Sequence, residues 1–182
     1  MYKDIIRPLL EKPRFIHSVN VSNMAKKLAG IYGEDQEKAA VAGILHDIMK
    51  NTSQDKQLKM LNDYGIYLTP LEKLSPKLWH AILGAEYIKS ELGVEDQEIV
   101  NAVRYHTTAR ENMTKLEKII FVSDFISEDR TYTGVEKIRS VAFEDIDYAV
   151  FEGLSFSIES LLRKKCTIHP DTIGAYNEIL TK

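Results

Sequence analysis

The stretch Val41-Ala-Gly-Ile-Leu-His46-Asp47-Ile-Met-Lys50 is the end of an apolar helix that stops on a His-Asp pair. His46 and Lys50 are one i,i+4 step apart and Asp47 and Lys50 one i,i+3 step, so all three side chains can face one pocket. A neutral imidazole beside a carboxylate suits a divalent metal ion, and the ammonium beside them suits a phosphate. A His-Asp dipeptide often arises by chance. The interpretation gains weight because His and Asp residues take similar places in other predicted helices.

The length and composition of the chain limit the class of protein it can be. The chain has 182 residues, 44% of them hydrophobic and 28% charged, so we expect one globular domain that spans residues 1–182. A formal net charge of −3 does not indicate a surface for nucleic acid. The one cysteine, Cys166, cannot form an internal disulfide, which fits a reducing cytoplasm. The sequence shows neither a membrane-spanning apolar run nor a signal-peptide core, so we expect a cytoplasmic protein that does not bind membranes.

Hydrophobic residues recur with helical periodicity nearly throughout, which predicts an all-α fold. The longest early helix should run from Pro13 to about Tyr32, with Gly33 as its stop. Its core face is expected to be His17, Val21, Met24, Leu28 and Ile31. We expect the other helices at residues 4–10, 35–46, 53–64, 76–92, 96–106, 116–126, from 135, at 145–165 and from 170, with a loop through Gly65 and Pro70. Asp35 is the expected cap of the second of these helices, and Asp96 or Glu95 should open the fifth. Thr114-Lys-Leu-Glu117 has the form of a capping box before the sixth.

Five of these helices each place a side chain that can bind a metal ion on a core-facing position. These residues are His17, His46 with Asp47, His80, His106 and Asp124. Any one of them alone is more often a hydrogen-bonded core residue than a metal ligand. Four buried imidazoles and two buried carboxylates would together need many separate partners, and shared metal ions satisfy them at once. A set without thiolates suits iron, manganese or zinc.

The same residues resemble the HD superfamily of metal-dependent phosphohydrolases. Five segments are similar to its YqeK-type branch of bacterial symmetrical diadenosine tetraphosphate hydrolases, and they cover almost the whole chain. They are Arg14-Phe-Ile-His17, Leu45-His-Asp-Ile-Met-Lys50, Arg104-Tyr-His-Thr-Thr-Ala-Arg110, Glu117-Lys-Ile-Ile-Phe-Val-Ser-Asp124 and Ile168-His-Pro. The resemblance implies a helical bundle of the HD type with a di-metal centre in its core.

The resemblance also implies roles. His17, His46, Asp47 and Asp124 would hold one metal ion, and His80 and His106 the second, with Asp47 bridging. Iron is the metal that the family implies, and manganese or another divalent ion is the alternative. A hydroxide that bridges two metal ions would attack phosphorus and cut diadenosine tetraphosphate into two ADP. Asp47 and Lys50 are then the expected catalytic residues.

Several side chains are candidates for binding the polyphosphate. Lys50 lies one turn from His46, and its alternative role is that of a solvated lysine at a helix end. Arg110 lies one turn from His106 and could bind a phosphate through two N–H groups, or form a surface ion pair. The full candidate set is Arg14, Lys50, Thr107, Arg110 and Arg130. His169 precedes a proline at a helix start, where we expect it to cap the helix.

The sequence departs from the YqeK-type branch in two places. Ala109 stands where the branch usually has Gly, and Ser127 to Arg130 stand where the branch usually has a Pro-Gly-type turn. They bear on the shape of the substrate-binding loops and so on the exact nucleotide preference. Three alternatives stay open from the sequence. The chain could hydrolyse another nucleotide or small phosphoester, it could be a nucleotide-sensing module with little turnover, or its histidines could be structural. The sequence also leaves open which metal is physiological and whether the chain forms a homodimer.

Overall fold

The computed structural model describes residues 2–181, and every regular element in that range is a helix. The predicted all-α fold is therefore confirmed. The helices are α1 (Tyr2–Ile6), α2 (Lys12–Tyr32), α3 (Gln36–Leu45), α4 (Gln54–Asp63), α5 (Pro70–Lys73), the 3₁₀ helix η1 (Pro76–Leu78), α6 (Trp79–Ser90), α7 (Gln97–Tyr105), α8 (Lys115–Ile126), α9 (Val135–Ala142), α10 (Ile146–Arg163) and α11 (Pro170–Thr181).

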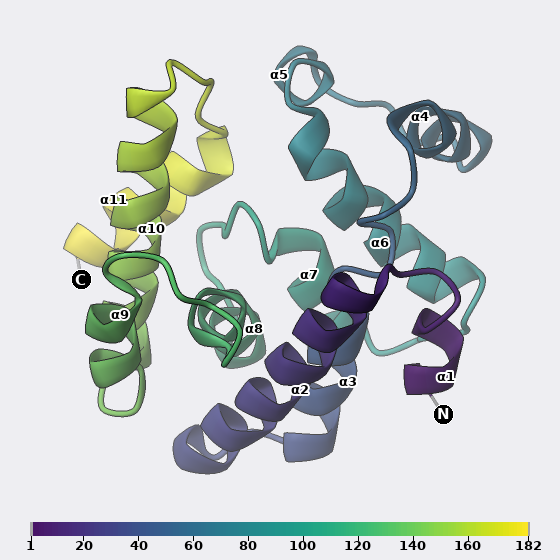
Figure 1. The fold of residues 1–182 in the computed structure, drawn as a ribbon. Helices are drawn as coiled ribbons and strands as arrows, with labels where there is room; N and C mark the ends of the chain where they lie inside the picture. Colours follow the sequence, from purple (N-terminus) through teal and green to yellow (C-terminus); the bar gives the residue numbers. More distant parts are fainter. Residues whose placement is uncertain (1, 182) are drawn as a thin grey trace.

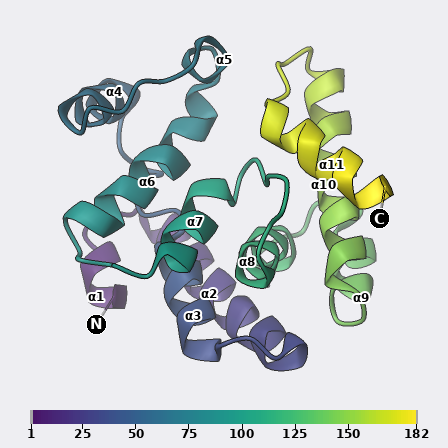
Figure 2. The same cartoon turned by 180° about the vertical axis from the view of Figure 1, so that it is seen from behind.

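Helix α8 runs through the middle of the molecule (Figures 1 and 2). Helices α2, α3 and α7 pack on one side of it and α9 and α10 on the other, with α11 against α10. Its side chains are buried nearly all round, as at Ile119, Ile120 and Phe121. It begins at the predicted capping box, in which the Thr114 hydroxyl accepts from the Glu117 N–H and the Glu117 carboxylate accepts from the Thr114 N–H. This central helix fixes where Asp124 lies.

Helices α2 and α3 form a tight hairpin. The turn between them uses Gly33, whose φ of 64° is left-handed, and Asp35, whose carboxylate caps the N–H groups of Glu37 and Lys38. Both features were predicted. The two helices approach so closely at Gly43 that a Cβ built there would lie 2.8 Å from the Cα of Ser22.

The predicted core face of α2 is wrong at one position, and the close approach of α2 and α3 explains why. Ile31 is 48% exposed, although the sequence pattern placed it in the core. Small residues are buried instead, among them Ser18, Ser22 and Ala25, and Ser22 lies against Gly43 of α3. A short distance between helix axes requires small side chains at the contact, and the apolar pattern alone did not reveal it.

Two predicted helix bounds are wrong, and one helix was not predicted. α1 ends at Ile6, before Arg7-Pro8, because proline disfavours helical backbone in the preceding residue. Residues Pro70–Lys73 form α5, where the sequence predicted a loop, and this helix starts with its own capping box from Thr69. The helix expected from Pro76 begins as η1 and becomes α-helical only at Trp79.

No helix within residues 2–181 is both long enough and apolar enough to cross a membrane.

The α2–α3 approach predicts opposite effects for two glycine substitutions. Gly43→Ala should lower the free energy of unfolding by about 2 kcal/mol, because the added methyl overlaps the backbone of Ser22. Gly84→Ala is the matched control: a Cβ there lies 3.6 Å from its nearest neighbours, Ile48 and Val103. It should raise the free energy of unfolding by about 0.5 to 1 kcal/mol through backbone entropy. Urea denaturation of both variants measures this, and equal effects would contradict the packing described.

Candidate metal centre

Five helices bring their candidate ligands to one point in the core. They are His17 on α2, His46 at the end of α3 and Asp47 directly after it, His80 on α6, His106 at the end of α7 and Asp124 on α8. Three groups have ligand atoms that lie within 4.8 Å of one another, a spacing that a metal ion can bridge. These groups are His17–His46–Asp47, His46–His106–Asp124 and Asp47–His80–His106.

Asp47 lies at the centre of the set and is 2% exposed. Its Oδ2 atom faces the Nε2 atoms of His46 at 3.4 Å and His17 at 4.0 Å. Its Oδ1 atom faces the Nε2 atoms of His80 at 3.1 Å and His106 at 3.6 Å. The two oxygens of one carboxylate thus divide the four imidazoles into two pairs.

The outer nitrogen of three imidazoles is held by an acceptor. Nδ1 of His46 donates to the carbonyl of Gly43 and Nδ1 of His106 to the carbonyl of Val103, both at 2.7 Å. Each carbonyl comes from three residues earlier in the same helix, so the helix ends themselves orient these rings. Since a carbonyl can only accept, Nδ1 carries the proton and Nε2 of the neutral ring is left to coordinate.

His17 is oriented by a side chain instead. Its Nδ1 donates to Oδ2 of Asp129 at 2.8 Å, and Asn20 Nδ2 donates to the other oxygen of Asp129 at 3.0 Å. The ring therefore turns its Nε2 toward Oδ1 of Asp124, 2.9 Å away. A carboxylate behind a metal-binding imidazole fixes the ring orientation and makes the ring a stronger ligand.

The carboxyl groups of the cluster are ionised. Burial raises the pKa of Asp47, but positive charge next to it lowers it well below its usual range, and the Arg14 guanidinium lies 2.7 Å from its Oδ2 atom. Burial also raises the pKa of Asp124, and the neighbouring His17 and Arg130 bring it well below its usual range. Burial lowers the pKa of His80 to about 4, so this ring is neutral at pH 7.

The donor atoms fit a bound cation. Among the described residues, His46 Nε2 and Asp47 Oδ1 are buried without a hydrogen bond of acceptable geometry. The Nε2 atoms of His80 and His106 face each other at 3.2 Å, although the second ring already has its proton on Nδ1. Lone pairs that converge on ionised carboxylates repel one another unless a positive charge lies between them. Imidazole and carboxylate together suit divalent iron, manganese or zinc, so these residues form a site for divalent metal.

Three cationic side chains from the candidate set for polyphosphate binding border the cluster. Arg14 Nη1 donates to Asp47 Oδ2 at 2.7 Å, and Lys50 Nζ lies 3.2 Å from His80 Nε2. Arg130 forms an ion pair with Asp124. All three side chains are about one-third exposed. They therefore reach both the metal ligands and the solvent from which a substrate arrives.

Thr107 and Arg110 differ from each other in their surroundings. Thr107 Oγ1 is buried, has no hydrogen-bond partner among the described residues and lines a cleft beside the centre. Arg110 is bound instead to the buried carboxylate of Glu117, with Nη2–Oε1 at 2.7 Å and Nε–Oε2 at 3.1 Å. This pair joins the α7–α8 loop to α8 and occupies the guanidinium, so the contacts of Arg110 do not support the expected phosphate binding.

Two residues that support the site were not predicted from the sequence. One is Asp129, behind His17. The other is Arg139, whose guanidinium donates to the carbonyls of Ile126, Ser127 and Arg130 at 2.8 to 3.0 Å. It thereby fixes the loop that carries Arg130. Both side chains act from a loop or a following helix, where no periodicity signals a contact.

Ala109, which stands where the resembled branch usually has Gly, has a left-handed φ of 56° and is fully buried. A left-handed conformation costs a residue with a Cβ about 1 to 2 kcal/mol. The loop after α7 therefore keeps the backbone shape that a glycine adopts without this cost.

Several known proteins are similar to this chain. The sequence pattern of the HD domain family matches residues 14–129, the segment that holds all six candidate ligands. The chain is 38% identical to the symmetrical bis(5'-nucleosyl)-tetraphosphatase of Halalkalibacterium halodurans, over 97% of this chain and 94% of that protein. The enzymes of the same name from Bacillus subtilis and Staphylococcus aureus are 35% and 33% identical, over 97% and 96% of this chain and 94% and 91% of theirs.

A solved structure is also similar. It is that of a predicted HD superfamily hydrolase involved in NAD metabolism from Clostridium acetobutylicum, which superposes with a TM-score of 0.95 at 34% identity. The match covers 99% of this chain and 95% of that one. The fold is therefore that of an HD hydrolase over nearly its whole length, including the helices after residue 129.

The contact behind His17 gives a testable prediction. Asp129→Ala should weaken binding of the first Mn²⁺ ion by about 10- to 100-fold, because the ring loses the acceptor that orients it. Glu128→Ala is the matched control: it removes the exposed neighbouring carboxylate, which is not the one bonded to His17. Calorimetric titration of the metal-free protein with Mn²⁺ measures both. Equal affinities for the two variants would show that Asp129 does not support the ligand.

Proposed function

Since this chain belongs to the HD domain family, we propose that it is a metal-dependent hydrolase that cuts dinucleoside tetraphosphates symmetrically, diadenosine tetraphosphate into two ADP. The observation that carries the proposal is the division of the four imidazoles between the two oxygens of Asp47. The names of relatives that match along nearly the whole chain support the substrate.

The proposed cofactor is a pair of divalent metal ions, with iron as the physiological metal and manganese as the alternative. His17, His46 and Asp124 would bind on one side of Asp47, and His80 and His106 on the other. When bound, such a pair polarises a phosphoryl group and activates water. The separate role of the two Asp47 oxygens fits a bridging carboxylate.

The protein's own cations bind and neutralise the polyphosphate. Arg14, Lys50 and Arg130 surround the cluster and are each partly exposed, so phosphate oxygens can reach them. Negative charge that develops on the leaving oxygen needs a positive partner close to the reacting phosphorus. Lys50, the cation beside His80, is the residue we assign to that role.

Symmetrical cleavage breaks the central P–O–P bridge. The oxygen of one water molecule forms a bond to one of the two inner phosphorus atoms, and the bond from that phosphorus to the bridging oxygen breaks. The electron pair stays on the bridging oxygen, which leaves as part of the second ADP, and the two protons of the water are divided between products and solvent.

Two further parts of the proposal concern the whole chain. The candidate ligands come from helices spread from α2 to α8, and α10 packs on α8, which supports one domain over residues 1–182. Cys166 is exposed and unpaired, which supports a cytoplasmic location because such thiols stay reduced there.

The proposal is tested by product analysis. Wild-type protein, purified without oxygen and loaded with Fe²⁺ or Mn²⁺, should convert diadenosine tetraphosphate into ADP as the sole nucleotide product. His46→Ala, which lacks a ligand, should yield no ADP. ATP with AMP as products would contradict symmetrical cleavage, and absence of any turnover would contradict the proposed activity.

Lys50 should affect turnover without affecting the metal. Lys50→Met should lower kcat by about 100-fold while metal content stays that of the wild type. Lys56→Met, which removes an exposed lysine on α4, is the matched control and should keep wild-type kcat. Loss of metal from Lys50→Met would instead make the lysine part of the metal site.

A further inference from the structure

We propose that one nucleoside of the substrate binds in a cleft between η1 and the end of α10, and that the other nucleoside has no pocket with comparable apolar walls. This inference rests on the proposed function and deepens it. We call this cavity of about 460 Å³ the η1–α10 cleft; among the residues that line it are Pro76, Leu78, Thr107, Leu161 and Lys165. A cavity of this size suits a ligand of a few hundred daltons.

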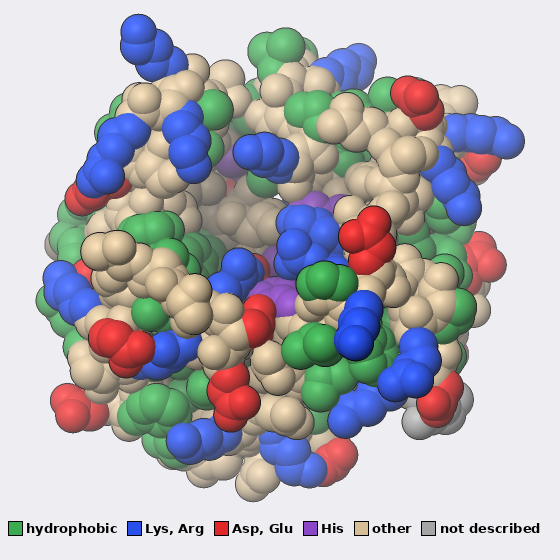
Figure 3. Space-filling view, in the orientation of Figure 1, with side chains coloured by type: hydrophobic (Ala, Val, Ile, Leu, Met, Phe, Trp, Pro, Cys, Tyr) green, Lys and Arg blue, Asp and Glu red, His purple; other side chains and the backbone are tan. Residues whose placement is uncertain are grey.

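The η1–α10 cleft adjoins the metal centre. Thr107, which directly follows the candidate ligand His106, lines it, and its buried hydroxyl has no partner among the described residues. Pro76 and Lys77 line both this cleft and a pocket of about 400 Å³ that contains Lys50 and His80. Among the described residues that line this second pocket, only Pro76 is apolar, so it offers a second base little apolar surface. Figure 3, in the orientation of Figure 1, shows a hollow in the molecular surface with histidine and basic side chains around it. A phosphate chain can therefore run from the cleft to the metal centre without crossing the core.

The lining of the η1–α10 cleft suits a nucleoside. Leu78 and Leu161, both half-buried, offer apolar surface to the faces of a base. Hydroxyl groups of Thr107 and Ser157 can bond to the ribose or the base edge, and lysines such as Lys165 lie at its exposed side. Apolar walls with a few placed polar groups are typical of sites for small molecules.

The walls of the η1–α10 cleft are fixed by contacts between distant parts of the chain. Ser75 Oγ and Thr167 Oγ1 are hydrogen-bonded at 3.0 Å, and Thr172 Oγ1 donates to the carbonyl of Thr108 at 2.8 Å. His169 accepts from the N–H of Asp171 at 3.2 Å, the capping contact expected from the sequence. The C-terminal helices thus form one wall of a site whose metal ligands all lie earlier in the chain.

The pocket on the other side of the centre has a different character. It has a volume of about 240 Å³ and is lined by Arg14, His17 and Arg130, with Glu11, Asn51 and Asp129. Of the side chains that line it in the described part of the chain, only Pro13 is apolar. Such a pocket suits phosphates and gives a second base no apolar wall.

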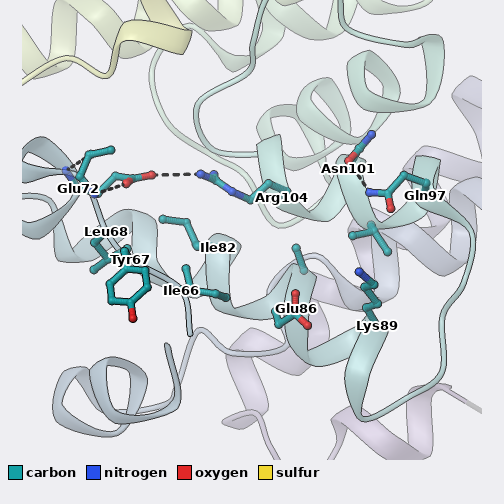
Figure 4. Close-up of a pocket in the computed structure, with 13 residues that line it drawn as sticks. Ile66, Tyr67, Leu68, Glu72, Ile82, Glu86, Lys89, Gln97, Asn101 and Arg104 are labelled. Carbon is teal, nitrogen blue, oxygen red and sulfur yellow. Dashed lines mark hydrogen bonds and ion pairs between the residues drawn. The ribbon is translucent and has the colours of Figure 1, made fainter. Parts of the chain in front are cut away.

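One further cavity matches the η1–α10 cleft in size but not in position. It lies between α6, α7 and the α4–α5 segment, has a volume of about 460 Å³, and none of the six candidate ligands lines it (Figure 4). Its Arg104 is held by the buried Glu72 at 3.1 Å. A nucleoside there would not lead its phosphates to the metal centre.

Calorimetric titration of the Mn²⁺-loaded protein with ADP and with pyrophosphate tests the η1–α10 cleft directly. Leu161→Trp fills it and should weaken ADP binding by about tenfold or more, with pyrophosphate affinity unchanged. Leu162→Trp, at the exposed next residue, is the matched control and should leave both unchanged. Unchanged ADP affinity in Leu161→Trp, or equal loss of both ligands, would overturn the proposal.

Thr107→Val gives a second test that changes little volume. Loss of the hydroxyl should weaken ADP binding by about fivefold and leave pyrophosphate binding as in the wild type. An ADP affinity equal to that of the wild type would overturn the assignment of Thr107 even if Leu161→Trp failed to fold.

Recognition of a single nucleoside has its own test. Adenosine 5'-tetraphosphate, which lacks the second nucleoside, should have a KM within about threefold of that of diadenosine tetraphosphate. A much higher KM would overturn recognition of one nucleoside only. Failure of the wild type to cut either compound would contradict the proposed function, whereas the ADP titration would still decide whether the η1–α10 cleft binds a nucleoside.

Discussion

The structure depends on one buried carboxylate, that of Asp47, with two imidazoles facing each of its oxygens. An ionised group in the core is costly unless positive charge or hydrogen bonds compensate it. Here the surrounding rings direct lone pairs at the same oxygens, and the outer nitrogens of three rings are already committed to acceptors. Metal ions resolve this conflict, so the polar core and the metal site are the same feature.

The rest of the fold keeps these groups in place. The close approach of α2 and α3 at Gly43 brings His17 toward the end of α3, and the Gly43 carbonyl orients His46. α8, packed on both halves of the molecule, fixes Asp124. The loop after α8 adds Asp129 behind His17, and Arg139 fixes that loop. The helices after Asp124 contribute no candidate ligand, but they form one wall of the η1–α10 cleft, which ties substrate binding to the C-terminal part of the chain.

Helical periodicity could predict the all-α fold and the six side chains that meet in the core, because each lies on an apolar face or at a helix end. Caps at Asp35, Asp96 and Thr114 were also readable, since their signals are local. Contacts that involve loop residues could not be predicted, because no helical periodicity relates the two partners. The partner of Arg110 is seven residues away, and the contact of His17 with Asp129 spans 112 positions. The short helix α5 was missed because four residues are too few for periodicity.

The arrangement of the imidazoles around Asp47 predicts that this carboxylate bridges two metal ions. Crystals of the Mn²⁺-loaded protein, measured at an X-ray energy where manganese scatters anomalously, test it most directly. We expect two anomalous peaks about 3.5 to 4 Å apart, one beside each oxygen of Asp47, with His80 and His106 around one of them and His17 and His46 around the other. A single peak, or two peaks of which neither contacts Asp47, would contradict it.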